Sequence, residues 1–328
     1  MQFVNDLDGW LIASNYTLLA TTDGGKTWSK SYSGRAELGD LDFVGPNHGW
    51  LRTYNPNQLL RTTDGGLHWT VIGEPLGVVL TRLDFLSPTT GWGLTNLGTL
   101  LMTTDGGVQW SKVSSPLATS LCVTATGRLW LGTTAATVDD SMNNGTTWQV
   151  SLPWPTVALV LPERVAPWVT CSGFGAWALY DLGEAAGSSD YAVLATGDNG
   201  SHWTPLLVNN QSNSSGSLPN VSNTVANDGA SGAGSAWFLG LCGPCNGVGT
   251  AEIVTAAGAS VSHTVPLPEA TIEELDAAFA DPTHGWIVST DKGAPNPDAP
   301  DQGLPLNILA TTDGGATWRV IATIPAEP

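Results

Sequence analysis

The stretch "TTDGGKTW" (residues 21–28) decides the fold, because it returns along the chain. Close copies are "TTDGGLHW" (62–69), "TTDGGVQW" (103–110) and "TTDGGATW" (311–318), and weaker copies are "SMNNGTTW" (141–148) and "TGDNGSHW" (196–203). The first three copies end at Trp28, Trp69 and Trp110, which are 41 residues apart. A fixed period of this size is typical of repeat architectures, in which each repeat forms one structural unit.

A second phrase, a small or apolar residue followed by tryptophan, precedes each copy. Its tryptophans are Trp10, Trp50, Trp92, Trp130, Trp177, Trp237 and Trp286. These are seven, against six copies of the first phrase, and the missing copy is expected near 255–262, where Ala257 replaces the aspartate. The sequence therefore contains seven units, of which the sixth is degenerate.

Each unit alternates apolar and polar residues between turn-forming Gly, Pro and Asn, as in "LDFVGPNHGWLRT" (41–53). This pattern indicates short strands and contains no helical period. Four strands fit into about 41 residues, the size of a propeller blade. We therefore predict an all-β protein, a single seven-bladed β-propeller over residues 1–328 with four-stranded antiparallel blades. Because each blade can be built from contiguous chain, we expect the ring to close without an exchanged strand.

The repeated phrase is predicted to be the turn between the third and fourth strands of a blade. An aspartate before a tight turn can accept hydrogen bonds from backbone N–H groups two or three residues further on. Glycine supplies a conformation that a side chain forbids, and the tryptophan packs against the next blade. A residue present in every blade suits a structural role better than a single catalytic site. The predicted structural residues are Asp23, Asp64, Asp105, Asn143, Asp198 and Asp313.

The pattern Ser/Thr-x-Asp-x-Gly-x-Thr-Trp resembles the Asp-box, or BNR repeat, of sialidases, sortilin-type receptors, xyloglucan-degrading enzymes and Ycf48-like proteins. The combined form "GWGLTNLGTLLMTTDGGVQW" (91–110) is most similar to the Ycf48-like branch. That resemblance implies a seven-bladed propeller, and the namesake of the branch assists photosystem II assembly. The resemblance covers the whole chain, but it rests on a structural motif and therefore says more about fold than about function.

Composition limits the partners. The chain has 29 acidic and 11 basic residues, a net charge of −18, which disfavours nucleic acid and anionic membranes as partners. No apolar run is long enough to span a bilayer, so no membrane insertion is expected. We expect a secreted or extracytoplasmic monomer whose signal peptide or lipid anchor lies outside this sequence.

The four cysteines are Cys122, Cys171, Cys242 and Cys245. The Cys-Gly-Pro-Cys segment lacks the following helix that a thioredoxin-like site requires, so a small disulfide between Cys242 and Cys245 is expected, with free or metal-bound thiols as alternatives. Cys122 and Cys171 lie eight and six residues before Trp130 and Trp177. Equal parity predicts that they face the same way on neighbouring blades, as buried small hydrophobes rather than as a bridge.

No residue pattern carries a defined chemistry. Sialidase chemistry is unsupported, because the early Arg-Ile-Pro-type segment of those enzymes is missing. The five histidines fall at repeat positions and the loop carboxylates show no pairing, so no catalytic residue, metal or cofactor is predicted. A carbohydrate-active enzyme, either a glycoside hydrolase or a lyase, stays open as the alternative to a binding or assembly propeller.

The long connections locate the predicted working surface. In blades 4–7 the chain lengthens only between the second and third strands and between consecutive blades, which places every extension on the face opposite the Asp-box turns. Extended loops on a rigid scaffold are typical of binding sites. We therefore expect this face to bind a protein or a glycan. The predicted contact residues are Trp154, Arg164, Trp168, Tyr180, Asp181, Asp291 and Lys292.

Overall fold

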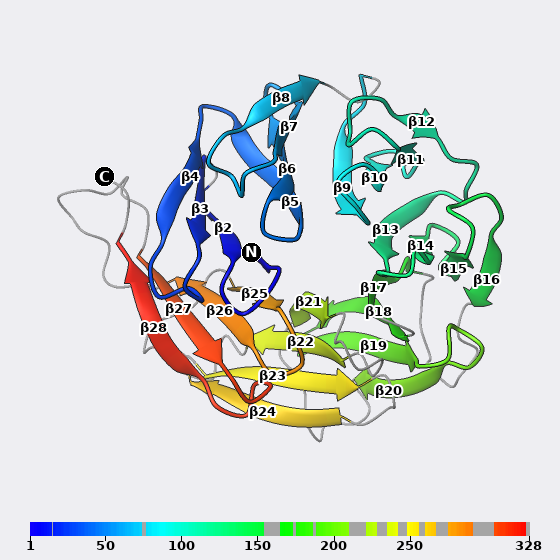
Figure 1. The fold of residues 1–328 in the computed structure, drawn as a ribbon. Helices are drawn as coiled ribbons and strands as arrows, with labels where there is room; N and C mark the ends of the chain where they lie inside the picture. The colour runs from blue at the N-terminus through cyan, green and yellow to red at the C-terminus, as the bar shows by residue number, and fades with distance from the viewer. Residues whose placement is uncertain are drawn as a thin grey trace.

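The computed structural model describes residues 1–14, 16–73, 77–153, 165–172, 175–185, 188–209, 221–227, 235–241, 248–255, 260–266, 275–290 and 305–325 (Figure 1). For the sixth sheet only the backbone is described. Every regular element in these ranges is a β-strand, and no helix in them is long and apolar enough to cross a membrane.

The strands form seven four-stranded antiparallel sheets, each built from four consecutive strands. Blades 1–3 are β1 (Gln2–Phe3), β2 (Gly9–Ser14), β3 (Thr17–Thr21), β4 (Ser29–Ser33); β5 (Glu37–Val44), β6 (His48–Tyr54), β7 (Gln58–Thr62), β8 (Thr70–Gly73); and β9 (Leu80–Phe85), β10 (Gly91–Thr95), β11 (Leu100–Thr103), β12 (Ser111–Lys112). Blades 4 and 5 are β13 (Ala118–Val123), β14 (Leu129–Thr133), β15 (Val138–Ser141), β16 (Gln149–Leu152); and β17 (Trp168–Ser172), β18 (Gly175–Ala185), β19 (Ser188–Thr196), β20 (Thr204–Asn209). Blades 6 and 7 are β21 (Val221–Asn227), β22 (Ser235–Leu241), β23 (Val248–Thr255), β24 (Ser260–Pro266); and β25 (Leu275–Phe279), β26 (Gly285–Thr290), β27 (Leu306–Thr311), β28 (Arg319–Ile324).

The blades follow one another around a ring, as the colour gradient of Figure 1 shows. The first strand of each blade is innermost, and it contacts the first strands of both neighbouring blades. The last contact of the ring joins β25 to β1, and both sheets are complete from contiguous chain. The predicted all-β propeller with four-stranded blades is therefore confirmed, as is closure without an exchanged strand.

The Asp-box turn is held by two side chains rather than one. The Thr21 hydroxyl accepts a hydrogen bond from Gly25 N (3.0 Å) and donates to Asp23 Oδ1 (2.9 Å). Asp23 then accepts from Thr27 N (2.9 Å) and from the Thr27 hydroxyl (2.6 Å), and these bonds lower the pKa of Asp23 to about 2. The acceptor thus reaches four residues ahead, not two or three as expected. Equivalent bonds occur at Asp64, Asp105, Asn143, Asp198 and Asp313.

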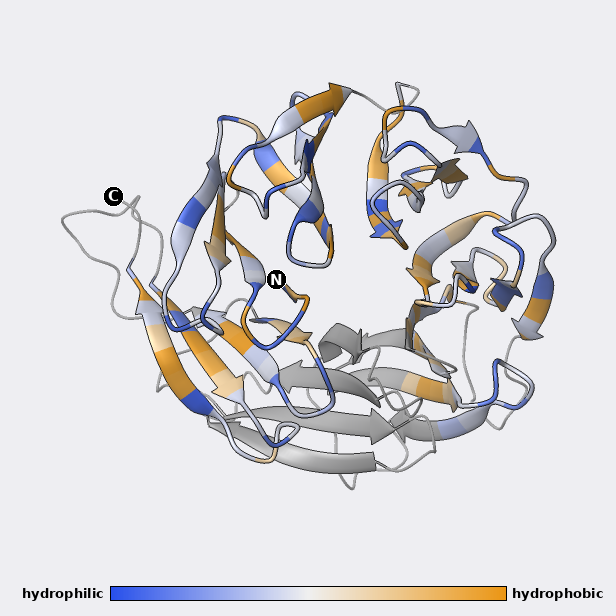
Figure 2. Ribbon diagram, in the orientation of Figure 1, coloured by the Kyte–Doolittle hydropathy of each residue, from blue (hydrophilic) through white to orange (hydrophobic). Residues whose placement is uncertain are grey.

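The two repeated phrases meet across the seams between blades. The indole N–H of Trp10 donates to the carbonyl of Gly65 in the next blade's Asp-box turn (3.0 Å), and Phe43 of that blade stacks on Trp10 (centroids 3.5 Å apart). The "GW" glycine is required because a Cβ at Gly9 would collide with the ring of Phe3 in the adjacent strand. Each phrase therefore supplies half of an inter-blade contact, which explains why both repeat. The apolar stretches lie mainly in the strands (Figure 2).

Backbone hydrogen bonds define two faces. Gly24 N donates to Leu7 O (2.9 Å), so the Asp-box turn and the turn between the first two strands share one face. Thr134 N donates to Leu117 O (2.9 Å), which joins the opposite turn of blade 4 to the connection entering that blade. We call the second face the entry face, because each innermost strand begins there.

Candidate functional site at the entry end of the ring centre

The innermost strands carry side chains at two equivalent positions. The first position lies opposite the repeat tryptophan on the second strand, and it holds Gln2, Asp42, Asp84, Cys122 and Thr170 in blades 1–5. The second position lies two residues earlier, nearer the entry face, and it holds Asp40, Arg82, Ser120, Trp168 and Asp276 in blades 2–5 and 7. The N-terminal ammonium of Met1 pairs with Asp276, which closes the ring between blades 7 and 1.

Residues at the first position link neighbouring innermost strands. In blades 1–3 this residue offers a side-chain oxygen to a backbone N–H of the next innermost strand. The bonds run from Phe43 N to Gln2 Oε1 (2.7 Å), from Phe85 N to Asp42 Oδ2 (2.6 Å) and from Val123 N to Asp84 Oδ2 (2.7 Å). Asp40 also accepts from Leu83 N. The carboxylates at the ring centre are therefore part of the wall that joins blades 2, 3 and 4.

Asp42 and Asp84 both have raised pKa values. Burial is the main reason that the pKa of Asp42 rises to about 7, and repulsion from Asp40 adds to it. Burial and repulsion from Asp42 raise the pKa of Asp84 well above its ordinary value, while Arg82 partly offsets both effects. Around neutral pH this part of the ring centre therefore carries less negative charge than its three carboxyl groups suggest.

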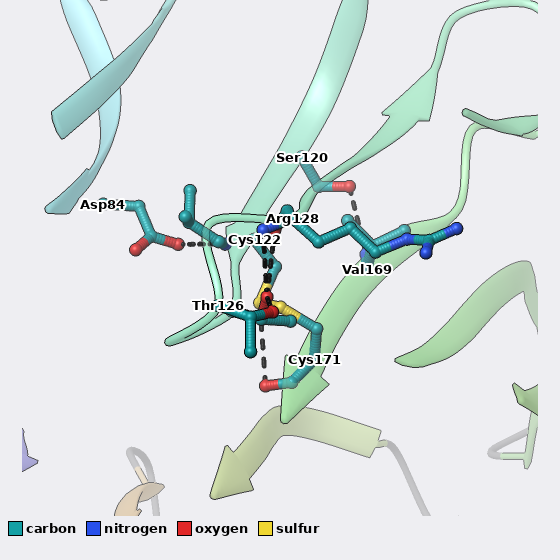
Figure 3. Close-up of a disulfide and its surroundings, with 9 residues drawn as sticks. Asp84, Ser120, Cys122, Thr126, Arg128, Val169 and Cys171 are labelled. Carbon is teal, nitrogen blue, oxygen red and sulfur yellow. Dashed lines mark hydrogen bonds between the residues drawn. A yellow bond between two sulfur atoms is a disulfide. The ribbon is translucent and has the colours of Figure 1, made fainter. Parts of the chain in front are cut away.

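The seam between blades 4 and 5 is joined covalently. Cys122 and Cys171 form a disulfide with their Cα atoms 5.9 Å apart (Figure 3), so the prediction that they are unbridged is wrong. Cys122 lies opposite Trp130, whereas Cys171 lies opposite Ala176, one residue from Trp177. The first hairpin of blade 5 is one residue shorter than that of blade 4. This missing residue turns Cys171 to the opposite side of its strand from the one expected from its spacing to Trp177. Its sulfur therefore reaches that of Cys122.

An aromatic and a cation meet at the entry end of the ring centre. The Arg82 guanidinium lies over the Trp168 ring, 4.7 Å from its centroid, and Trp168 is 39% exposed. Arg82 belongs to blade 3 and Trp168 to blade 5, so their contact spans the innermost strand of blade 4. The equivalent residue of blade 4 is Ser120, which is small and buried. This arrangement presents an apolar plate and a positive charge side by side.

Ser120 holds the chain on both sides of Trp168. Its hydroxyl donates to Pro167 O (2.9 Å) and accepts from Val169 N (3.0 Å; Figure 3). Gly132 on the neighbouring strand leaves the room for this contact, because a Cβ there would collide with Pro167 O. The position of Trp168 is therefore set by hydrogen bonds to rigid strands.

Arg52 on β6 is a second cation toward the entry face. Its side chain is only 2% exposed, stacks against Tyr54 (3.9 Å to the ring centroid) and donates to the Tyr54 hydroxyl. Its Nε and Nη1 atoms have no hydrogen-bond partner among the described residues, and no ion pair is described for it. A buried guanidinium without a counter-ion is costly, so a role beyond packing is worth testing.

The predicted contact residues have different outcomes. Trp168 lies at the entry face with its ring exposed, and its contact with a ligand stays a prediction. Tyr180 is fully buried, because the extra chain of blade 5 extends the hairpin β18–β19 rather than a loop, and burial raises the pKa of Tyr180. For Asp181 only its backbone in β18 is described. Trp154, Arg164, Asp291 and Lys292, the cysteines Cys242 and Cys245, and Ala257 of the degenerate turn lie outside the described residues.

Arg82 and Ser120 were missed from the sequence. Both lie on innermost strands and not in the long connections, and loop length was the criterion. Aligning the strands on their repeat tryptophans would have found them, because Arg82 is the one basic residue at its position in the described blades. No group of three or more His, Cys, Asp or Glu in the described part of the chain is arranged to hold a metal ion.

Comparisons with known proteins agree with this architecture. The family model for the photosystem II assembly factor YCF48 matches residues 32–152, and that for the BNR/Asp-box repeat matches residues 19–30. A comparison with curated protein sequences finds no match.

Similar solved structures include YCF48 bound to a D1 peptide (20% identity, 88% of each chain covered, TM-score 0.59) and YCF48 from Cyanidioschyzon merolae (18%, 98% of this chain and 88% of that one, 0.56). A GH74 xyloglucanase from Xanthomonas campestris is also similar (14%, 95% and 46%, 0.59). Structural matches at these identities show the fold alone. By its repeat motif and its fold the chain is a β-propeller with BNR/Asp-box repeats, and over residues 32–152 it is similar to the YCF48 family.

Proposed function

We propose that this propeller is a non-catalytic binding or assembly protein that holds a peptide segment of a protein partner at the entry end of the ring centre. The observation that carries the proposal is the contact between Arg82 and the exposed ring of Trp168. Tryptophan and arginine are the residues most enriched among those that dominate protein interfaces.

The geometry favours a segment that carries an apolar side chain next to an acidic one. The exposed face of Trp168 can cover an apolar or aromatic side chain, and the Arg82 guanidinium can pair with a carboxylate beside it. Both groups stand on strands rather than on loops, and Ser120 fixes the backbone around Trp168. Preorganisation of this kind lowers the entropy that binding must overcome.

The similarity to YCF48 bound to a D1 peptide supports a peptide ligand for this fold. The partner of this chain is a separate question, since the two sequences are only 20% identical. We further propose an extracytoplasmic location, because structural disulfides persist mainly in oxidising compartments and Cys122 is bonded to Cys171.

A carbohydrate ligand is the alternative, favoured by the likeness to a GH74 xyloglucanase and by the sugar-stacking chemistry of an exposed tryptophan. A glycan array together with incubation on xyloglucan separates the two. Binding of a glycan with loss at Trp168→Ala would favour a lectin-like role. Release of shorter oligosaccharides would favour an enzyme.

The peptide proposal is tested with a phage-displayed library of random dodecapeptides, selected on the disulfide-bonded protein. We expect enriched peptides to pair an aromatic or aliphatic residue with Asp or Glu. Trp168→Ala and Arg82→Gln should each weaken binding by about fivefold or more, as expected for interface residues worth more than about 1 kcal/mol. Leu67→Ala is the matched control, because Leu67 is 79% exposed on the opposite, Asp-box face. Equal binding by all three variants would refute the proposal.

A further inference from the structure

The disulfide occupies a position that is otherwise filled by a hydrogen bond. In the three preceding seams, the first-position side chain of one blade accepts the N–H of the residue that follows that position in the next blade. Cys122 and Cys171 are the equivalent pair at the seam between blades 4 and 5. At this seam a disulfide therefore takes the place of the hydrogen bond. A reductant can break the disulfide, whereas it has no effect on the hydrogen bonds of the other seams.

The disulfide is also close in sequence to the proposed binding residue. Cys171 and Trp168 lie on the same short strand, β17, three residues apart. On the blade 4 side, Ser120 and Cys122 both lie on β13. Ser120 contacts Val169 and Cys122 is bonded to Cys171, and in both pairs the partner lies 49 residues further along the chain. Besides the disulfide, the Ser120 hydroxyl ties the two segments together at this end: it accepts a hydrogen bond from Val169 N and donates one to Pro167 O.

We propose that the Cys122–Cys171 disulfide is a redox-controlled latch on the binding site, so that its reduction loosens β17 and weakens binding at Trp168. The inference rests on the proposed peptide-binding function. Cys122 is half-buried and Cys171 almost fully buried, so a small dithiol attacks the Cys122 sulfur.

The exchange is balanced. A thiolate of the dithiol bonds to the Cys122 sulfur, the bond between the two cysteines breaks, and Cys171 leaves as a thiolate and takes up a proton. The second thiol of the reductant then displaces Cys122, so the reductant ends as a disulfide and the protein as two thiols.

Reduction removes the covalent restraint without removing any group that contacts the ligand. Neither thiol is an acceptor comparable to the carboxylate of Asp84, which holds the preceding seam. The seam between blades 4 and 5 then depends on Ser120, and Trp168 gains conformational freedom that binding must remove. Ordering one such side chain and its strand weakens affinity by about three- to tenfold.

The test measures the affinity of one library-selected dodecapeptide for the oxidised protein, for protein reduced with dithiothreitol, and for Cys122→Ser/Cys171→Ser. Amide hydrogen exchange of Val169 is followed in the same three samples without peptide. We expect the reduced protein and the double variant to bind about three- to tenfold more weakly and to exchange Val169 N–H faster. Trp286→Phe, which removes the indole bond to Gly24 O at the seam between blades 7 and 1, controls for global loss of stability and should keep full affinity.

The two proposals fail in different ways. If the oxidised and reduced proteins bind the peptide equally and protect Val169 equally, the disulfide is a passive staple and the latch is refuted. If no selected peptide depends on Trp168 even in the oxidised protein, the proposed binding function fails. In that case, unchanged exchange at Val169 on reduction still refutes the latch. Faster exchange would show that the disulfide restrains β17 but would refute its control of binding.

Discussion

Trp50 and Trp92 occupy equivalent positions in blades 2 and 3 but differ in the hydrogen bond of the indole N–H, which makes them a useful pair to compare. Both side chains are fully buried. The Trp50 indole N–H donates to Gly106 O (2.8 Å), whereas the Trp92 indole N–H has no partner among the described residues. In the turn that Trp92 faces, Asn144 stands where the turns of blades 1, 2, 3 and 7 have their first glycine.

Trp50→Phe and Trp92→Phe remove the same volume from buried sites, so the cavity contribution is similar in both. Trp50→Phe also loses a buried hydrogen bond, about 1 kcal/mol, whereas Trp92→Phe removes an unpaired donor whose burial costs about 1–3 kcal/mol. We therefore expect Trp50→Phe to lower the free energy of unfolding by about 2 kcal/mol more than Trp92→Phe does.

Urea unfolding followed by far-UV circular dichroism measures both variants against the wild type, and matching slopes confirm comparable unfolding transitions. Phe85 stacks on Trp50 with ring centroids 3.5 Å apart, and it retains a ring to stack on in Trp50→Phe. Equal losses in the two variants, or a larger loss for Trp92→Phe, would refute the argument that the two repeated phrases are joined by the indole bond.

Three further predictions concern the turns, the ring centre and the buried cation. Thr62→Val should cost about 1–2 kcal/mol in urea unfolding, because the Thr62 hydroxyl is the acceptor for the buried Gly66 N. Asp42 has a raised folded-state pKa of about 7, so the native state holds a proton that the unfolded chain has lost, and stability falls as the pH rises from about 4 to 7 and then levels off. The free energy of unfolding of Asp42→Asn relative to wild type should therefore increase over that range, by at most about 1.4 kcal/mol per pH unit, and a difference independent of pH would contradict the assignment. Arg52→Met should raise the melting temperature, since it removes a buried charge for which the described residues supply no counter-ion, and it should weaken peptide binding; a destabilised variant with unchanged binding would show that Arg52 serves packing.

The repeats made the fold predictable, because the same local turn chemistry had to be written into each blade. Thr21, Asp23 and Gly25 fix one turn through bonds within five residues, so the signal is local and readable. Ring closure was also predictable, since each sheet is complete from contiguous chain.

The site was harder to predict, because it depends on registers between strands from different blades. One residue fewer in the first hairpin of blade 5 turned Cys171 toward Cys122 and reversed the inference from parity. The extra chain of blade 5 was interpreted as a loop, but pairing between β18 and β19 extended the hairpin and buried Tyr180. Arg82 meets Trp168 only because Ser120 between them is small, a relation that no single segment reveals.

Binding of a peptide at the entry end of the ring centre is the central claim, and amide hydrogen exchange with and without a library-selected dodecapeptide tests it most directly. The account predicts that the peptide slows exchange in β9 and β17, around Arg82 and Trp168, and leaves the Asp-box turns at 62–69 and 103–110 unchanged. Protection confined to those turns, with β9 and β17 unaffected, would contradict it.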